Sequence, residues 1–198
     1  MSCLNLDEDK NSILGILDEL NSFIGFTKCF TNSKRFKHTL TVIQNDIFLI
    51  QAEIANPTAV LYKPSRIDQD HVRYIEMQTS LTDKHIKEID HFIIPEGTKF
   101  ACALHCVRTI SRRVEREILK YGRQEKAKLL NAAALNKDLK KLSLTIDLYA
   151  RYFDRVACLT FAMARLENNR LGRRERKPSY YRDESILTKE NTKRRRKQ

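Results

Sequence analysis

The sequence predicts an all-α protein, a five-helix up-and-down bundle followed by a basic C-terminal tail. Apolar residues recur every three or four positions over long stretches, which is the spacing of one helix face. Only five of the 198 residues are glycine and four are proline, which favours helices over a turn-rich β fold. No stretch of useful length alternates apolar and polar residues as a half-buried strand would.

Two amphipathic helices are predicted in the first third of the chain, over residues 12–28 and 33–55. The apolar face of the first is formed by Ile13, Ile16, Leu17, Leu20 and Ile24. The second carries a nearly regular heptad stripe of Phe36, Leu40, Ile43, Ile47, Ile50 and Ile54. The pair Asn56-Pro57 ends the second helix, because the residue before a proline is disfavoured in the helical conformation.

Residues 68–90 are predicted to form a weaker, more exposed helix with few apolar positions. The turn Pro95-Glu96-Gly97 then precedes a long central helix. The core-facing stripe of this helix consists of Phe100, Leu104, Val107, Val114 and Ile118. Residues 121–141 are expected to extend two helices beyond the bundle, and the last core helix is predicted over residues 142–169.

The net charge of +12 is concentrated at one end of the chain. From Arg170 onward there are twelve Lys or Arg against four Asp or Glu, which places +8 in the last 29 residues. We therefore predict one helical domain over residues 1–170 and a largely disordered basic tail over 171–198. The closing KRRRK is compatible with nucleic-acid binding, but so short a tail is weak support and we expect another main function.

The cysteines and the chain start give indications of the compartment. Five cysteines, an odd number without a CxxC pair, indicate a reducing environment. Cys102, His105 and Cys106 cluster on the central helix, where we expect small core residues rather than metal ligands. No apolar run approaches the roughly 18 residues of a membrane span. The acidic start MSCLNLDEDK resembles no targeting segment, and we expect an intracellular protein.

A second stripe of the central helix is polar and rich in arginine. Arg108, Arg112 and Glu115 lie at positions i, i+4 and i+7, with Arg113 and Arg116 beside them. Guanidinium groups are planar forks suited to bidentate contacts with phosphate or carboxylate. The stripe indicates an anion site or salt bridges between subunits, although spacing alone favours a solvated basic face.

Three segments, in order along the chain, resemble the PduO-type ATP:cob(I)alamin adenosyltransferase family. They are DELNSFIG at 18–25, FIIPEGT at 92–98 continued by the arginine-rich helix to Arg116, and YFDRVACLTFAMAR at 152–165. With the intervening helices the resemblance covers roughly residues 12–170. It implies transfer of the adenosyl group of ATP to reduced corrinoid cobalt, which makes adenosylcobalamin and releases triphosphate. It also implies ATP with Mg²⁺ and cobalamin as ligands, and the bacterial cytoplasm or the mitochondrial matrix as the compartment.

The same resemblance implies roles for individual residues. Arg112 and Glu115 become the catalytic pair, with Arg112 as phosphate clamp and Glu115 as a possible Mg²⁺ ligand. The ATP-binding set consists of Arg108, Arg112, Arg113, Glu115 and Asp154.

The resemblance also implies a homotrimer with active sites between subunits. Asp18 would form an inter-subunit salt bridge to Arg108 of a neighbouring chain, whereas its spacing alone favours a solvated carboxylate. Phe92 would lie below the corrin and Tyr181 near it, whereas without the family pattern Phe92 is simply a core anchor.

Three departures from the family pattern leave alternatives open. The family begins with a phosphate-binding segment, and Met1 falls about where that segment would already have finished. Asp154 stands in place of an Asn and Cys158 in place of an Asp, and a carboxylate at 154 would repel phosphate unless protonated or metal-bound. The alternatives are a catalytically impaired trimeric homologue that binds corrinoid or acts as a scaffold and, more weakly, a basic helical nucleic-acid-binding protein.

Overall fold

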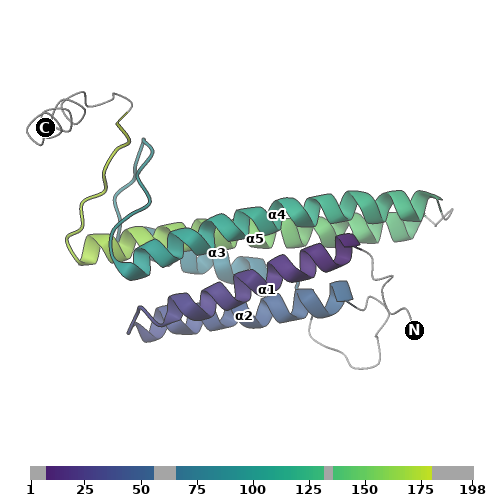
Figure 1. The fold of residues 1–198 in the computed structure, drawn as a ribbon, viewed down its shortest axis with the longest axis horizontal. Coiled ribbons are helices and arrows are strands. Elements are labelled where there is room, and N and C mark those ends of the chain that lie inside the picture. Colours follow the sequence, from purple (N-terminus) through teal and green to yellow (C-terminus); the bar gives the residue numbers. More distant parts are fainter. Residues whose placement is uncertain (1–7, 56–65, 132–135, 180–198) are drawn as a thin grey trace, which may run out of the picture.

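The computed structural model describes residues 8–55, 66–131 and 136–179, and its elements are five helices without a strand in those ranges. The helices are α1 (Glu8–Lys28), α2 (Lys34–Ala55), α3 (Gln69–Asp83), α4 (Lys99–Asn131) and α5 (Asn136–Arg170). Figure 1 shows α4 and α5 side by side along the whole length of the molecule, with α1 and α2 as a second, shorter pair. The all-α prediction is confirmed.

Three helices, α2, α3 and α4, begin where a side chain accepts a free backbone N–H of the first turn. Ser33 precedes α2 and accepts from the N–H of Phe36 at 3.4 Å. Asp68 precedes α3 and accepts from the N–H of Asp70 at 2.8 Å. Thr98 precedes α4 and accepts from the N–H of Ala101 at 3.0 Å.

One continuous hydrophobic core joins the helices. The predicted stripes of α2 and α4 are buried throughout, and in α1 only Ile16 is partly exposed. α1 packs on both α2 and α4, and α3 packs on α5. Because full burial of one such side chain contributes about 1.5–3 kcal/mol, the periodic apolar residues account for the way the helices associate.

The predicted helix over residues 68–90 is wrong for residues 84–90, because α3 ends at Asp83. The last turn tightens, with the N–H of His85 donating to the Thr82 carbonyl at 3.1 Å. Farther on, the Lys87 carbonyl accepts from the Arg165 guanidinium of α5 at 2.7 Å rather than from a helical N–H. A tertiary contact thus keeps residues 84–90 out of the helix that their sequence favours.

The prediction that residues 121–141 extend two helices is confirmed, although α5 begins at Asn136, earlier than the 142 expected for the core helix. The two helices run past the start of α1 as a projecting hairpin (Figure 1). Gly122 lies at their contact, where an added Cβ would come within 2.6 Å of Ile146. A glycine at this point lets the two backbones approach closely.

The chain reverses after α5 and returns along the segment that joins α3 to α4 (Figure 1). Gly172 has a left-handed φ of 62°, and the N–H of Arg173 donates to the Asn168 carbonyl at 2.8 Å, which closes the helix end. The N–H of Ile94 then donates to the Arg176 carbonyl at 2.9 Å. Residues 171–179 are called the return strap below; residues 180–198, the rest of the predicted basic tail, lie outside the described residues.

The cysteines are less buried than the sequence analysis expected. Cys106 is exposed and Cys102 is only partly buried, so their assignment as core residues is wrong for Cys106. The spacing placed Cys106 beside the apolar stripe of α4 but did not show on which side of the stripe it lies. Among the described helices, none combines the length and apolar character that crossing a bilayer requires.

Candidate functional site

A chain of charged side chains crosses from α4 to α5 and on to α3. Arg112 of α4 contacts Glu115 at 3.0 Å and forms a second ion pair with Asp154 of α5. The other oxygen of Asp154 lies 3.6 Å from Arg155, whose Nε lies 3.3 Å from Glu76 of α3. The order is therefore Glu115, Arg112, Asp154, Arg155 and Glu76, and we call these five residues the α4–α5 charge cluster.

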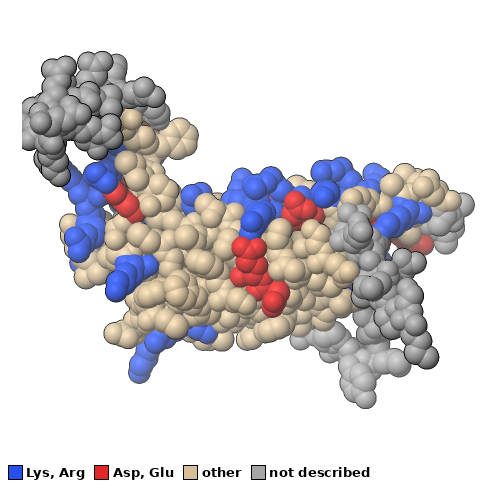
Figure 2. Space-filling model, viewed as in Figure 1, with Lys and Arg blue, Asp and Glu red and all other residues tan. Residues whose placement is uncertain are grey.

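This cluster is accessible from solvent, since the Arg112 side chain is 46% exposed. In Figure 2, Lys and Arg side chains follow α4, and a separate group of acidic side chains lies below them, over α1. Three of the predicted ATP-binding residues, Arg112, Glu115 and Asp154, are thus brought together by the packing of α4 on α5.

Asp154 is held by two guanidinium groups, which the sequence analysis did not anticipate. From the sequence we expect this carboxylate to require a proton or a metal ion beside phosphate, whereas in the structure Arg112 and Arg155 neutralise it directly. One turn later, burial and the nearby Asp154 raise the pKa of the Cys158 thiol. A thiol with a raised pKa is a poor nucleophile at neutral pH.

The other two arginines of the predicted set face elsewhere. Arg113 pairs with Glu19 of α1, on a different side of α4 from Arg112. The Arg108 guanidinium lies 5.9 Å from the centre of the Phe161 ring, and its Nε is buried without a hydrogen-bond partner among the described residues. Asp18 is exposed on α1, and within the described part of this single chain no ion pair joins it to Arg108.

His105, one turn before Arg108, is buried beside the same phenylalanine. Its ring lies 6.0 Å from that of Phe161, and neither ring nitrogen has a hydrogen-bond partner in the described ranges. Burial and the charge of Arg108 lower the pKa of His105 to about 4. The imidazole is therefore neutral at physiological pH.

Phe92 lies in the connection between α3 and α4, and its side chain is 78% exposed. An apolar ring so exposed is not a core anchor, the role that its sequence position alone favoured. Tyr181, the second predicted corrin contact, lies outside the described residues.

Asn168 is a structural residue whose contacts the sequence analysis missed. Its side-chain amide donates to the Glu96 carbonyl at 2.8 Å and accepts from the N–H of Thr98 at 3.1 Å. These bonds fasten the turn before α4 to the end of α5. The sequence identifies Asn168 only as a residue suited to a helix end, because contacts across 70 positions leave no local pattern.

The residues available for a metal ion are few. No group of three or more His, Cys, Asp or Glu side chains suited to a metal occurs in the described ranges. Glu115 already contacts Arg112. A Mg²⁺ ion near Glu115 would therefore have to be held largely by the phosphates that it accompanies.

Comparisons with known proteins identify relatives of the whole helical body. The family model described as cobalamin adenosyltransferase matches residues 5–167. A corrinoid adenosyltransferase of Bacillus subtilis is 28% identical over 172 residues, which cover 83% of this chain and 79% of the relative. A corrinoid adenosyltransferase of Citrobacter freundii is 26% identical over 171 residues, covering 84% of this chain and 85% of the relative.

Solved structures give the same result for the fold. A variant PduO-type ATP:corrinoid adenosyltransferase from Lactobacillus reuteri, complexed with cobalamin and ATP, superposes with a TM-score of 0.66 at 25% identity. The superposition covers 88% of this chain and 86% of the other. The resemblance found in the three sequence segments is confirmed. With its five helices and a family match over 5–167, this chain belongs to the cobalamin adenosyltransferase family, a family of transferase enzymes.

Proposed function

We propose that this protein transfers the adenosyl group of ATP to the reduced cobalt of a corrinoid and releases triphosphate. The observation that carries the proposal is the position of Arg112. Its guanidinium is half-exposed between Glu115 and Asp154, at the junction of α4 and α5. A half-exposed arginine held by partly exposed carboxylates can exchange one of them for a phosphate oxygen with little loss, because pairs near the surface contribute only about 0.2–1 kcal/mol.

The reaction asks the protein for binding and charge stabilisation rather than for a nucleophile. The electron pair of the reduced cobalt forms a bond to C5′ of ATP, and the electron pair of the C5′–O bond leaves with the triphosphate. Arg112 would stabilise the negative charge of this leaving group, and Glu115 would orient Arg112 and the accompanying Mg²⁺. Holding both substrates in line provides the remaining acceleration.

The corrin would lie against the exposed ring of Phe92. A large apolar face of the ligand can cover this ring, which the described chain leaves 78% exposed. An apolar ring beneath cobalt supplies no ligand atom, so the lower coordination position stays empty and reduction of cobalt becomes easier. Tyr181 remains a sequence-based expectation for a second aromatic contact.

The proposed assembly is a homotrimer in which Asp18 of one chain meets Arg108 of the next. Arg108 has a buried Nε without a hydrogen-bond partner in the described residues, and Asp18 is exposed. An unsatisfied buried donor costs about 1–3 kcal/mol. A carboxylate from a neighbouring chain could remove that cost and complete a site between subunits.

The direct test is an anaerobic assay with the purified chain, chemically reduced cobalamin and Mg-ATP. Conversion of the cob(I)alamin spectrum into that of adenosylcobalamin is expected, and Arg112→Ala should abolish ATP binding and transfer. The control is Arg151→Ala on the exposed face of α5, which removes the same charge outside the α4–α5 charge cluster. Full activity of Arg112→Ala would contradict the clamp role.

A corrinoid-binding homologue without turnover is the second candidate function. The ion pair between Arg112 and Asp154 favours it, because the carboxylate competes with phosphate for the same guanidinium. The same assay separates the two functions. Corrinoid binding without spectral conversion in the presence of saturating Mg-ATP would establish the second and overturn the first.

A further inference from the structure

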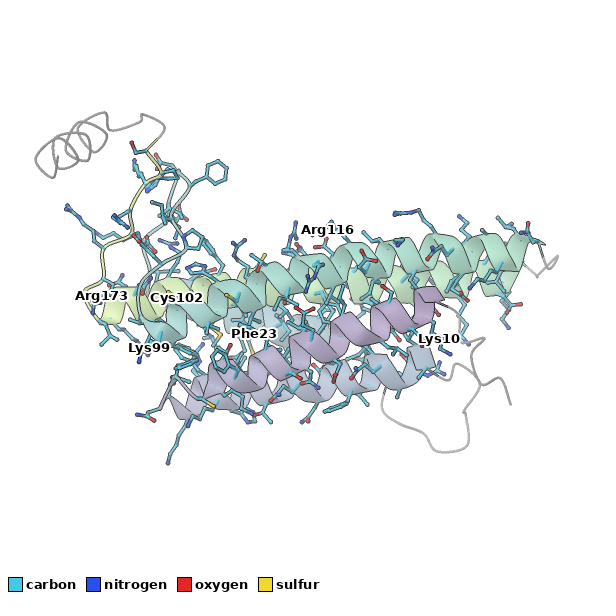
Figure 3. All side chains as sticks on the ribbon, in the orientation of Figure 1. Lys10, Phe23, Lys99, Cys102, Arg116 and Arg173 are labelled. Atoms are coloured by element: carbon cyan, nitrogen blue, oxygen red, sulfur yellow. The ribbon has the colours of Figure 1, made fainter. Side chains whose placement is uncertain are left out.

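A cavity of about 440 Å³ lies at the end of the bundle where the return strap leaves α5. Its walls include Lys87 from the α3–α4 connection, Arg165 from α5, and Arg173, Arg174 and Glu175 from the strap. Figure 3 places Arg173 at the end of the molecule opposite Lys10. Four basic side chains and one acidic side chain therefore surround one hollow.

The single acidic group of this wall is already neutralised. Glu175 receives two bonds from Arg165, at 2.7 Å from Nε and 3.2 Å from Nη2. Arg165 is buried, and its Nη2 also donates to the Lys87 carbonyl. The ion pair of Arg165 and Glu175 therefore adds no net charge to the wall of the cavity.

Three cations remain around the cavity. Lys87, Arg173 and Arg174 form no ion pair with an acidic side chain of the described residues. Like charges gathered around one hollow repel each other, and an anion in the hollow removes that repulsion. The cavity therefore has the character of an anion-binding site.

The strap holds two of these cations in place instead of leaving them on a free tail. Arg173 is fixed by its backbone bond to the Asn168 carbonyl at 2.8 Å. Three residues later, Arg176 pairs with Glu96, and its carbonyl accepts from Ile94. Arg174 lies between these two attachments. The backbone of Arg173 and Arg174 is thus ordered before a ligand binds, which reduces the entropy cost of binding.

The triphosphate of ATP is not the anion that this cavity fits. Arg165 follows Asp154 by eleven residues on α5, which is roughly 16 Å at a rise of 1.5 Å per residue. A triphosphate, about as long as three residues of extended chain or roughly 10 Å, does not reach from Arg112 to the cavity. A second anionic group, on another ligand, is required.

The cavity and Phe92 belong to the same connection between α3 and α4, with Lys87 five positions before Phe92. A corrinoid lying on Phe92 brings its own anion to this end of the bundle. Cobalamin carries one phosphodiester, in the nucleotide loop that bears its lower base, whereas the amide groups around the corrin are neutral. Cobinamide lacks this loop and its phosphodiester.

We propose that the cavity lined by Lys87, Arg173 and Arg174 binds the phosphodiester of the corrinoid nucleotide loop. The proposal rests on the proposed function, since it places the corrin on Phe92. It adds a substrate preference, for complete corrinoids over cobinamide. It also gives the displaced nucleotide loop a fixed position, which keeps the lower base from returning to cobalt.

The test compares the binding of cob(II)alamin and cob(II)inamide, by anaerobic absorption titration with Mg-ATP present. We expect the wild-type chain to bind cob(II)alamin about tenfold more tightly. The double variant Lys87→Gln/Arg174→Gln should lose this preference, with the Kd for cob(II)inamide changed by less than about twofold. The matched control Lys84→Gln/Arg151→Gln removes one lysine and one arginine that do not line the cavity, and should keep the preference.

Other outcomes separate the possible failures. If both corrinoids bind the wild type equally and the double variant changes neither Kd, the cavity proposal is overturned while the proposed function stands. If neither corrinoid binds, both fail. A parallel calorimetric titration measures the binding of inorganic phosphate. If phosphate binding depends on Arg174 but the preference for cob(II)alamin does not, the cavity is a site for free phosphate and the proposal is overturned.

Discussion

The side-chain amide of Asn168 occupies the space that a Cβ on Gly97 would need. The same amide donates to the Glu96 carbonyl and accepts from the Thr98 N–H, so it is bonded to the residues on both sides of Gly97. Gly97 itself has a φ of 130°, a conformation that residues with a side chain rarely adopt. The start of α4 and the end of α5 are therefore joined through a contact that only glycine at position 97 permits.

Gly97→Ala should lower the free energy of unfolding by about 2–4 kcal/mol, from backbone strain and from the loss of the Asn168 bonds. Denaturant unfolding followed by circular dichroism measures it. Gly15→Ala is the control, because Gly15 lies inside α1 with nothing within 4 Å of its added Cβ. That change should stabilise the protein by up to about 1 kcal/mol.

A double variant checks the assignment to Asn168. Asn168→Ala removes the colliding amide, so Gly97→Ala should cost less in that background than in the wild type, with only the φ strain remaining. Equal costs in the two backgrounds would show that Asn168 and Gly97 act independently.

Asp154→Asn should strengthen ATP binding by about two- to fivefold. The change removes a carboxylate that competes for Arg112, and half-exposed pairs of this kind contribute about 0.2–1 kcal/mol. Isothermal titration with Mg-ATP measures the Kd. Asp147→Asn, an exposed carboxylate farther toward the start of α5, is the control and should leave the Kd unchanged. Weaker ATP binding by Asp154→Asn would assign Asp154 to nucleotide binding rather than to competition.

The proposed inter-subunit salt bridge makes a prediction about charge-reversal variants. Asp18→Arg and Arg108→Asp should each weaken the trimer, because each places like charges opposite one another at a subunit boundary. The double variant Asp18→Arg/Arg108→Asp should recover the trimer. Sedimentation velocity measures the oligomeric state. The control reverses Glu19 and Arg113, which pair within one chain, and should not change the assembly. A double variant that assembles no better than either single variant would contradict the bridge.

Tyr152 and Asp46 predict how stability depends on pH. The Tyr152 hydroxyl donates to Asp46 Oδ2 at 2.6 Å, and both residues are buried. Burial raises the pKa of Asp46, while the bonds from Tyr152 and the nearby His71 partly oppose this. Because the folded state holds the proton more tightly than the unfolded state, Asp46 contributes full stability below about pH 4 and loses it as pH rises through its folded pKa.

Tyr152→Phe removes a hydrogen bond that favours the ionised carboxylate, so the pKa of Asp46 should rise further. The stability of the fold should then keep decreasing up to a higher pH than in the wild type. We expect a cost of about 1–3 kcal/mol at pH 7 and a smaller cost near pH 4. Denaturant unfolding between pH 4 and pH 8 measures both. In the Asp46→Asn background the same change should cost an amount that does not vary with pH, and a persisting pH dependence there would point to another group.

The sequence alone predicts the helices well because the apolar face of a helix follows from the spacing of residues within a few turns. The stripes of α2 and α4 are buried as the periodicity predicts, and the extension past residue 120 follows from its helix-forming composition. The helix prediction fails at residues 84–90 for a physical reason. Their local preference is helical, but the bond from Arg165 to the Lys87 carbonyl depends on how α5 packs, which no local window contains.

For the site, the sequence by itself determined which residues carry charge and how they are spaced around α4, because these follow from residue type and from a period of about 3.6. Only the tertiary structure decided what each charge meets. It brings Arg112 to Asp154, turns Arg113 to Glu19, and leaves the Nε of Arg108 without a partner in the described chain. The physical reason is that an ion pair depends on the packing of helices far apart in sequence, whereas helix formation depends on neighbours within one or two turns.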